Sequence, residues 1–212
     1  MKHPALLFFL FYSAFTIKAQ KYPDPEFSNE IYFLKKDSIH SLVRLEKDIS
    51  SMNTKMKLGG FGGGESGYTL KGEKSKVRLP DGENLSFVFS AGTSSGSSSA
   101  QSDSVLRANG LDPSIMSEMN DPASRITLYY TESGKGLRKI VTQKTPGAMG
   151  FGAKKMFSGS EKYTFSMKKI KEGYWELVID KTLPKGEYAF AMMNNGINTG
   201  DMSMLLFAFG ID

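Results

Sequence analysis

Histidine and cysteine, which most often carry nucleophilic and metal chemistry, are almost absent from this chain. The sequence holds no cysteine and two histidines, His3 and His40. Without cysteine, disulfides, thiolate metal sites and cysteine nucleophiles are excluded. His3 lies in a segment that we expect to be removed, so a Ser-His-Asp triad or a histidine metal site would depend on His40 alone. The sequence therefore predicts no catalytic site, no metal site and no cofactor, and an enzyme is not expected.

Carboxylates are the remaining candidates for acid–base chemistry. Two carboxylates about 5 to 9.5 Å apart are sufficient for glycoside hydrolysis. Five acidic residues lie in or beside the expected strands of the second half: Glu132, Glu172, Glu176, Asp180 and Glu187. A carboxylate-based glycan-active protein is therefore one alternative function, and it requires two of these side chains to meet in a cleft.

Three short strings match catalytic or nucleotide-binding motifs but lack the structural setting that those motifs need. Residues 62–67 match G-x-G-x-x-G, but a strand pattern follows instead of a helix. Residues 92–96 match G-x-S-x-G within a serine-rich stretch, where no strand-to-helix turn is expected. Ser166 and Lys169 match S-x-x-K, but on a strand they point to opposite faces. None of these strings predicts a site.

Methionines and aromatic residues provide two further hypotheses about binding. Thioethers are soft ligands for Cu(I), and eight methionines are closely spaced: Met52, Met56, Met116, Met119, Met192, Met193, Met202 and Met204. Met-based Cu(I) handling is a second alternative function. Carbohydrate binding would instead need a stacking platform, for which the candidates are Tyr32, Tyr129, Tyr130, Tyr174 and Trp175. Tyr129 and Tyr130 are adjacent and must face opposite ways on a strand, so we expect one to be exposed.

The first twenty residues have the pattern of a secretory signal peptide. Lys2 and His3 give a basic start, an apolar run of about fourteen residues follows, and Ala19 suits the position before cleavage. The run is too short for a membrane-spanning helix, and no later segment is long enough. We therefore predict a signal peptide at 1–19 and a mature domain at 20–212. An exported domain of this size without cysteine is typical of the Gram-negative periplasm or secreted fraction.

Charge excludes one class of partner. The formal charge is +5, and loss of Lys2 and Lys18 with the signal peptide reduces it to +3. The basic residues are interspersed with acidic ones, whereas a nucleic-acid-binding protein would cluster them on one face. We therefore expect no nucleic-acid partner.

The elements that would position these side chains are short strands. Alternation of apolar and polar residues predicts strands at 30–36, 41–47, 67–70, 76–79, 85–90, 125–131, 137–143, 162–170, 174–180, 187–193 and 205–209. Residues 37–40, 132–136 and 171–173 are expected hairpin turns. About ten short strands at this spacing predict an all-β fold, a single antiparallel sandwich of Ig-like or related topology.

Two segments interrupt the strand pattern. Residues 57–67 form a glycine-rich loop, and residues 91–124 form a long serine-rich insertion whose composition favours disorder. The insertion also contains Asp103-Ser104-Val105, which, like Asp37-Ser38-Ile39, resembles the Asp-Ser/Thr-aliphatic sites that some Gram-negative bacteria O-glycosylate on exported proteins.

Several strings, taken together, resemble a group of small exported bacterial β-modules. They are GEKSKVR at 72–78, LPKGEYAF at 183–190 and FAFGID at 207–212, read as G-x-x-S-x-V-R, L-P-x-G-E-Y-A-F and F-x-F-G-I-D. The resemblance implies fold and export, and no activity. The sequence therefore predicts an exported, non-catalytic binding or structural module of the cell envelope, with an envelope protein or a glycan as partner.

Overall fold

The computed structural model describes residues 22–56, 63–81, 84–91, 107–108, 110, 125–145, 159–171, 173–193 and 203–212. The predicted signal peptide, most of the glycine-rich loop and most of the 91–124 insertion lie outside these residues. The described chain is almost entirely β-strand, and its pairings are antiparallel apart from one, so the all-β antiparallel sandwich is confirmed. In the described part of the chain, no helix has the length and apolar character needed to cross a membrane.

Three sheets, named A, B and C, make up the fold. Sheet A has the order β12-β13-β7-β1-β2, sheet B the order β11-β8-β14-β15-β3, and sheet C the order β4-β5-β10-β9, while β6 pairs with β15 in parallel. The strands of sheet A are β1 (Glu30–Lys35), β2 (Ser41–Arg44), β7 (Ser86–Ser90), β12 (Phe165–Lys171) and β13 (Tyr174–Ile179). Those of sheet B are β3 (Glu46–Ser51), β6 (Arg78–Leu79), β8 (Ile126–Tyr130), β11 (Lys162–Tyr163), β14 (Gly186–Met193) and β15 (Ser203–Ile211). Those of sheet C are β4 (Asn53–Met56), β5 (Gly64–Lys71), β9 (Glu132–Gly134) and β10 (Leu137–Thr145).

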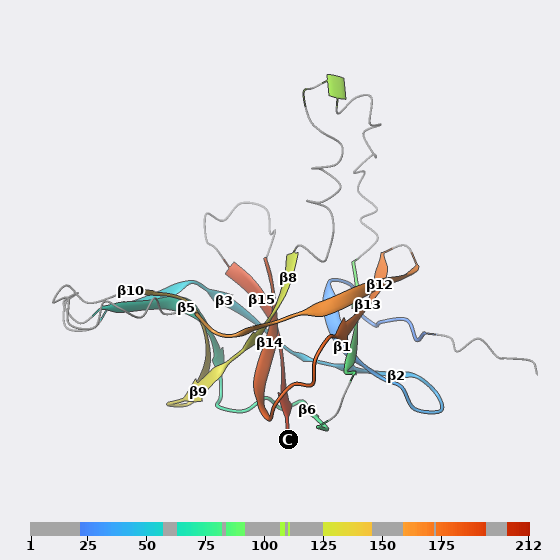
Figure 1. Cartoon of the computed structure of the whole chain (residues 1–212), viewed down its shortest axis with the longest axis horizontal. Helices are drawn as coiled ribbons and strands as arrows, with labels where there is room; N and C mark the ends of the chain where they lie inside the picture. Colours follow the sequence, from blue (N-terminus) through green and yellow to red (C-terminus); the bar gives the residue numbers. More distant parts are fainter. Residues whose placement is uncertain are drawn as a thin grey trace, which may run out of the picture.

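Sheet B is the central layer, with apolar side chains packed on both faces. Figure 1 shows β14 and β15 between β5 and β10 on one side and β1 and β13 on the other. Large side chains of β14, such as Tyr188 and Phe190, join the core shared with sheet A, where Phe87 and Phe190 have ring centroids 4.9 Å apart. The alternating Ala189 and Ala191 face Tyr68, Leu70 and Ile140 of sheet C. Because alanine is short, sheet C can pack closely against this face.

Strands that leave one sheet and enter the next connect the layers. Residues 41–47, expected as one strand, divide at the buried Leu45 into β2 of sheet A and β3 of sheet B. Residues 162–170, also expected as one strand, divide at Thr164 into β11 and β12 in the same way, although Tyr163, Phe165 and Met167 all face the core. Such sheet-switching bends are how packed sheets form corners, and the alternation pattern does not reveal them because the side-chain faces continue through the bend.

The predicted hairpin between 125–131 and 137–143 was wrong in its pairing. β8 pairs with β14 and β11 in sheet B, and after Thr131 the short β9 pairs with β10 in sheet C. The turn itself uses Lys135 at φ 55° and Gly136 at φ 76°. Two successive positive φ values are what a two-residue type I′ hairpin turn requires.

The N-terminal segment, residues 22–29, covers the outer face of sheet A. The Tyr174 hydroxyl donates to the Pro23 carbonyl at 2.7 Å, and the Phe27 N–H donates to the Tyr32 hydroxyl at 3.0 Å. Beneath the segment lies a small apolar cluster that includes Tyr32, Leu34, Val88 and Tyr174. These contacts make residues 22–29 part of the packed structure.

Candidate functional site

The two buried carboxylates among the predicted candidates, Glu176 and Glu187, do not meet. On β13, Trp175 and Leu177 face the core between sheets A and B, so the alternating Glu176 lies on the outer face of sheet A. Glu187 shares the sheet C side of β14 with Ala189. Two packed layers therefore separate Glu176 from Glu187, which is more than the spacing of a glycosidase pair, since one layer spacing is about 10 Å.

Of the other three acidic candidates, the two that the structure describes are exposed and have other partners. Glu132 is exposed on β9, with its Oε1 3.6 Å from Lys144 Nζ. Asp180 is exposed and accepts a 2.7 Å hydrogen bond from the Ser166 hydroxyl. Glu172 lies outside the described residues.

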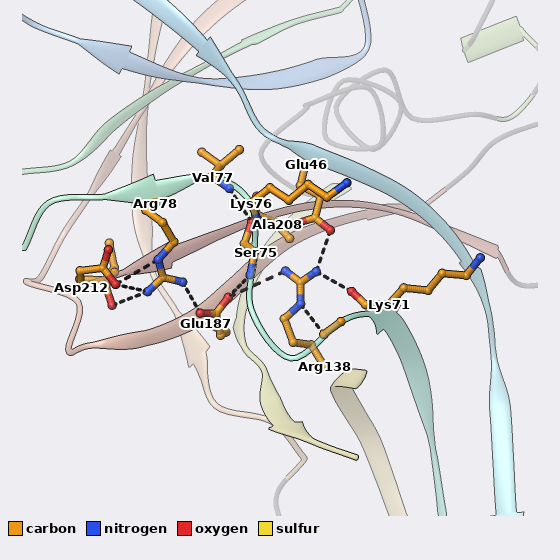
Figure 2. A network of polar contacts seen from close by, with 12 residues as sticks. Glu46, Lys71, Ser75, Lys76, Val77, Arg78, Arg138, Glu187, Ala208 and Asp212 are labelled. Atoms are coloured by element: carbon orange, nitrogen blue, oxygen red, sulfur yellow. Dashed lines mark hydrogen bonds and ion pairs between the residues drawn. The ribbon is translucent and has the colours of Figure 1, made fainter. Parts of the chain in front are cut away.

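The most extensive polar site in the described chain is one that sequence reasoning did not predict. We call it the Arg138 cluster, and it consists of Glu46, Ser75, Arg78, Arg138, Glu187 and Asp212 (Figure 2). These residues come from β3, the segment before β6, β6 itself, β10, β14 and the residue after β15. The cluster therefore connects sheets B and C and the single parallel strand.

Arg138 lies at the centre of this cluster. Its side chain is 0% exposed. Arg138 lies two residues before the core residue Ile140 on β10, so both side chains point inward from the same face of the strand. Nη2 donates to Glu46 Oε1 at 2.8 Å and to the Lys71 carbonyl at 2.9 Å, and Nε donates to the Gly72 carbonyl at 3.1 Å. Nη1 lies 3.9 Å from Glu187 Oε2. A buried guanidinium needs such acceptors, and Nη1 is the one nitrogen of Arg138 that has an ion-pair contact but no hydrogen-bond acceptor.

Ser75 joins the half-buried carboxylate of Glu46 to the buried carboxylate of Glu187 on the other side. Its N–H donates to Glu187 Oε2 at 2.7 Å, and its hydroxyl donates to Glu46 Oε2 at 2.8 Å. Burial alone would raise the pKa of Glu46, but hydrogen bonds from Arg138, Ser75 and the Lys76 N–H outweigh it and hold this pKa below the usual 4.5. Glu46 and Glu187 are thus a close carboxylate pair, but cations and N–H groups already occupy their oxygens.

Arg78 extends the cluster to the end of β15. Figure 2 shows its guanidinium between Glu187 and Asp212, with ion pairs to both carboxylates. The guanidinium also lies across Gly210, where a Cβ atom would collide with Arg78 Nη1 and lie 2.8 Å from Glu187 Oε1. A side chain at 210 would therefore displace the Arg78 guanidinium from its present position. The ion pair with Arg78 lowers the pKa of Asp212.

A second polar site lies on the outer face of sheet A, under the N-terminal segment. We call it the Glu176 cluster, and it consists of Tyr22, Lys36, His40 and Glu176. The Tyr22 hydroxyl donates to Glu176 Oε2 at 2.8 Å, Lys36 Nζ lies 2.7 Å from Glu176 Oε1, and the rings of Tyr22 and His40 are 5.7 Å apart. Burial would raise the pKa of Glu176, but hydrogen bonds from Lys36, Tyr22 and Ser86 lower it. The one histidine of the predicted mature chain is therefore beside a carboxylate site, yet that carboxylate is already neutralised.

Glu30 is a second buried carboxylate that neighbouring cations neutralise, at the other end of the sheet A face that the N-terminal segment covers. Arg44 holds its carboxylate with two hydrogen bonds, at 2.7 and 2.8 Å, and Lys47 adds a third at 2.9 Å. Burial opposes ionisation here too, but the two cations lower the pKa of Glu30. Phe27 of the N-terminal segment lies 4.4 Å from the Arg44 guanidinium carbon, measured from its ring centroid, which is a cation–π geometry.

The aromatic candidates do not form an exposed platform. Tyr32, Tyr129 and Tyr174 are buried. Tyr130 and Trp175 pack against the core between sheets A and B, where Trp175 stacks on Phe89. The expectation that Tyr129 or Tyr130 would be exposed was wrong, because both faces of sheet B are covered.

The methionine candidates are only partly described. Met193 and Met204 occupy opposite positions on β14 and β15, while Met192 is buried and Met52 is partly exposed. Met116, Met119 and Met202 lie outside the described residues, and nothing is described of the side chain of Met56. Among the described residues, no group of His, Asp or Glu side chains is arranged to hold a metal ion.

The sequence did contain a signal for the Arg138 cluster. GEKSKVR supplies Ser75 and Arg78, LPKGEYAF supplies Glu187, and FAFGID supplies Gly210 and Asp212. The strings on which the resemblance rests thus meet in space, and they do so as parts of a structural ion network. No family model, no curated protein and no solved structure matches the chain. The resemblance to exported β-modules therefore stays a prediction.

Proposed function

We propose that this protein is an exported, non-catalytic binding or structural module of the bacterial cell envelope. One observation supports the non-catalytic part most strongly. In the described chain, the carboxylates of the buried Glu30, Glu176 and Glu187 are each paired with Lys or Arg. A general acid needs a raised pKa and an accessible proton, whereas Glu30 and Glu176 have lowered pKa values. These side chains are suited to holding strands together.

The fold is compatible with export although it has no disulfides. An exported domain often depends on disulfides for stability, and this chain has no cysteine. Its layers are instead joined by apolar cores on both faces of sheet B and by the Arg138 cluster between sheets B and C. These features suit a rigid module that presents its loops and edges to a partner.

The geometry gives less support to the two alternatives. A carbohydrate platform needs exposed aromatic faces, and the five candidates are buried or packed against the core. A Cu(I) site needs two or more thioethers that converge. The described chain places Met193 opposite Met204, with Met193 exposed and Met204 packed against the core between sheets B and C.

Export is tested first, by fractionating cells of a Gram-negative host that expresses the full chain. An antibody raised against residues 20–212 avoids a tag on Asp212, which pairs with Arg78. We expect the protein in the periplasmic fraction or the culture fluid, with Gln20 as its N-terminus by mass spectrometry. Full-length protein confined to the cytoplasm would contradict the proposal.

The binding role is tested with the purified mature chain and isolated peptidoglycan sacculi. A glycan partner predicts co-sedimentation without release of soluble fragments, and a protein partner predicts a specific cross-link in intact cells. Release of fragments by the wild-type chain, reduced in Glu46→Gln or Glu187→Gln, would instead identify an enzyme at the carboxylate pair that we interpret as structural.

A further inference from the structure

The hairpin tip between β1 and β2 presents Asp37-Ser38-Ile39 to solvent. Lys35 and Ser41 are the last paired residues of the hairpin, so residues 36–40 form the loop. Asp37 and Ser38 are exposed, and the Ile39 side chain is 83% exposed. Asp37 Oδ2 lies 2.8 Å from Lys35 Nζ, an ion pair on the surface that leaves the carboxylate accessible. In Figure 1 this hairpin extends away from the body of the three sheets.

Ser38 is exposed, whereas several other serines of the chain are buried within the fold. Ser75, Ser86 and Ser160 are buried, and Ser75 and Ser160 take part in hydrogen bonds that hold loops to strands. A transferase that acts on a folded substrate has to enclose the acceptor hydroxyl and its two neighbours. Residues 37–39 permit this, because all three are exposed.

The Asp-Ser/Thr-aliphatic motif is rare in the sequence. Asp followed by Ser or Thr occurs at two places in the chain, 37–38 and 103–104, and an aliphatic residue follows in both. The second copy lies outside the described residues. The first is therefore the copy whose presentation the structure defines.

We propose that Ser38 is an O-glycosylation site, modified after export by an enzyme that recognises Asp37 and Ile39. The donor is an oligosaccharide linked to a polyprenyl diphosphate. The Ser38 hydroxyl oxygen forms a bond to the anomeric carbon as the bond from that carbon to the diphosphate oxygen breaks. The serine proton passes to a base of the transferase, and the polyprenyl diphosphate leaves. The fold tolerates the product because a glycan at this tip displaces no core side chain.

This inference rests on the export part of the proposed function, and the experiment separates the two. The full chain is expressed in a Gram-negative host that glycosylates Asp-Ser/Thr-aliphatic sites, once with its own residues 1–19 and once behind a signal peptide known to work in that host. Intact mass and glycopeptide fragmentation then report signal cleavage and glycan attachment independently. If only the second version is exported, the export proposal fails while the Ser38 proposal is still tested.

We expect the exported chain to carry a glycan on the peptide that contains Ser38. The modification should be lost from that peptide in Ser38→Ala and in Asp37→Asn, and kept in Ser38→Thr. Ser41→Ala is the matched control, because Ser41 is also exposed on this hairpin but follows His40, and it should remain fully modified. An unmodified Ser38 peptide in exported protein, beside a host protein that is glycosylated normally, would overturn the proposal.

Discussion

The Arg138 cluster and the Glu176 cluster both bury a carboxylate on a central strand, but they differ in where the neutralising groups come from. Arg138 is completely enclosed, and its partners belong to strands and connections far apart in the sequence. Glu176 is neutralised by Lys36, whose side chain is 45% exposed, and by Tyr22 of the N-terminal segment. One site depends on the whole fold, whereas the other depends in part on the N-terminal segment, which lies outside the sheets.

This difference determines how each site should respond to the loss of a partner. Removing one member of a buried ion pair leaves an uncompensated charge and costs about 3 to 5 kcal/mol, whereas an exposed pair contributes about 1 kcal/mol or less. The Arg138 cluster lies near the first limit, whereas the Lys36–Glu176 pair lies between the two, because its carboxylate is buried and its Lys36 side chain is 45% exposed. The following predictions compare them, beginning with the largest expected effect.

Arg138→Met should reduce the free energy of unfolding by about 3 to 5 kcal/mol, because Glu46 and Glu187 lose their shared buried cation. Chemical denaturation followed by tryptophan fluorescence measures this. The matched control is Lys139→Met, since Lys139 is the next residue of β10 and is not buried. A loss below about 1 kcal/mol in Arg138→Met would mean that the cluster does not hold sheets B and C together.

Gly210→Ala should be destabilising by about 1 to 3 kcal/mol, because the new methyl group meets the Arg78 guanidinium and a carboxylate oxygen of Glu187. Gly134→Ala is the control, as a Cβ at 134 meets no atom within 4 Å. Both changes are measured by thermal unfolding. If the two variants have equal melting temperatures, Arg78 does not lie across Gly210 in solution.

Much of this architecture could be predicted from the sequence, but the ion clusters could not. Alternation identified β7, β12 and β13 and their core faces, because the period of two reports directly which side chains are buried. It could not show that β2 and β3 belong to different sheets, since the side-chain pattern continues through Leu45. The alternation also could not predict that the Arg138 side chain is buried, because a charged residue in an amphipathic strand is normally assigned to the solvent face. The inward position of Arg138 depends on Glu46, which lies far away in the sequence.

Tyr22→Phe should reduce stability by about 1 kcal/mol, because it removes one hydrogen bond to a charged group that remains paired with Lys36. Its main effect should be local. Limited proteolysis within residues 22–29 should accelerate in Tyr22→Phe while the global unfolding midpoint changes little. Arg138→Met should give the reverse, with a lower midpoint and cleavage that follows global unfolding. Equal proteolysis profiles for the two variants would remove the distinction between the clusters.

The smallest expected effect is the pH dependence of stability that the carboxylates of the two clusters contribute. Glu30, Glu46 and Glu176 have folded pKa values below the usual 4.5. Their contribution to stability is therefore complete above about pH 4.5 and is lost as the pH falls through the folded values. Solvent limits each contribution to about 1 kcal/mol or less. In Arg138→Met, Glu46 no longer has its cation, so its folded pKa should rise and this contribution should disappear.

The stability difference between wild type and Arg138→Met should consequently shrink between pH 7 and pH 3, because protonation removes the unpaired charges that destabilise the variant. The difference between wild type and Tyr22→Phe should shrink far less, since Lys36 continues to neutralise Glu176. Denaturation curves at a series of pH values measure both differences. A gap for Arg138→Met that stays constant with pH would show that the variant is destabilised by lost packing alone, and the carboxylates of the Arg138 cluster would then have no electrostatic share in joining sheets B and C.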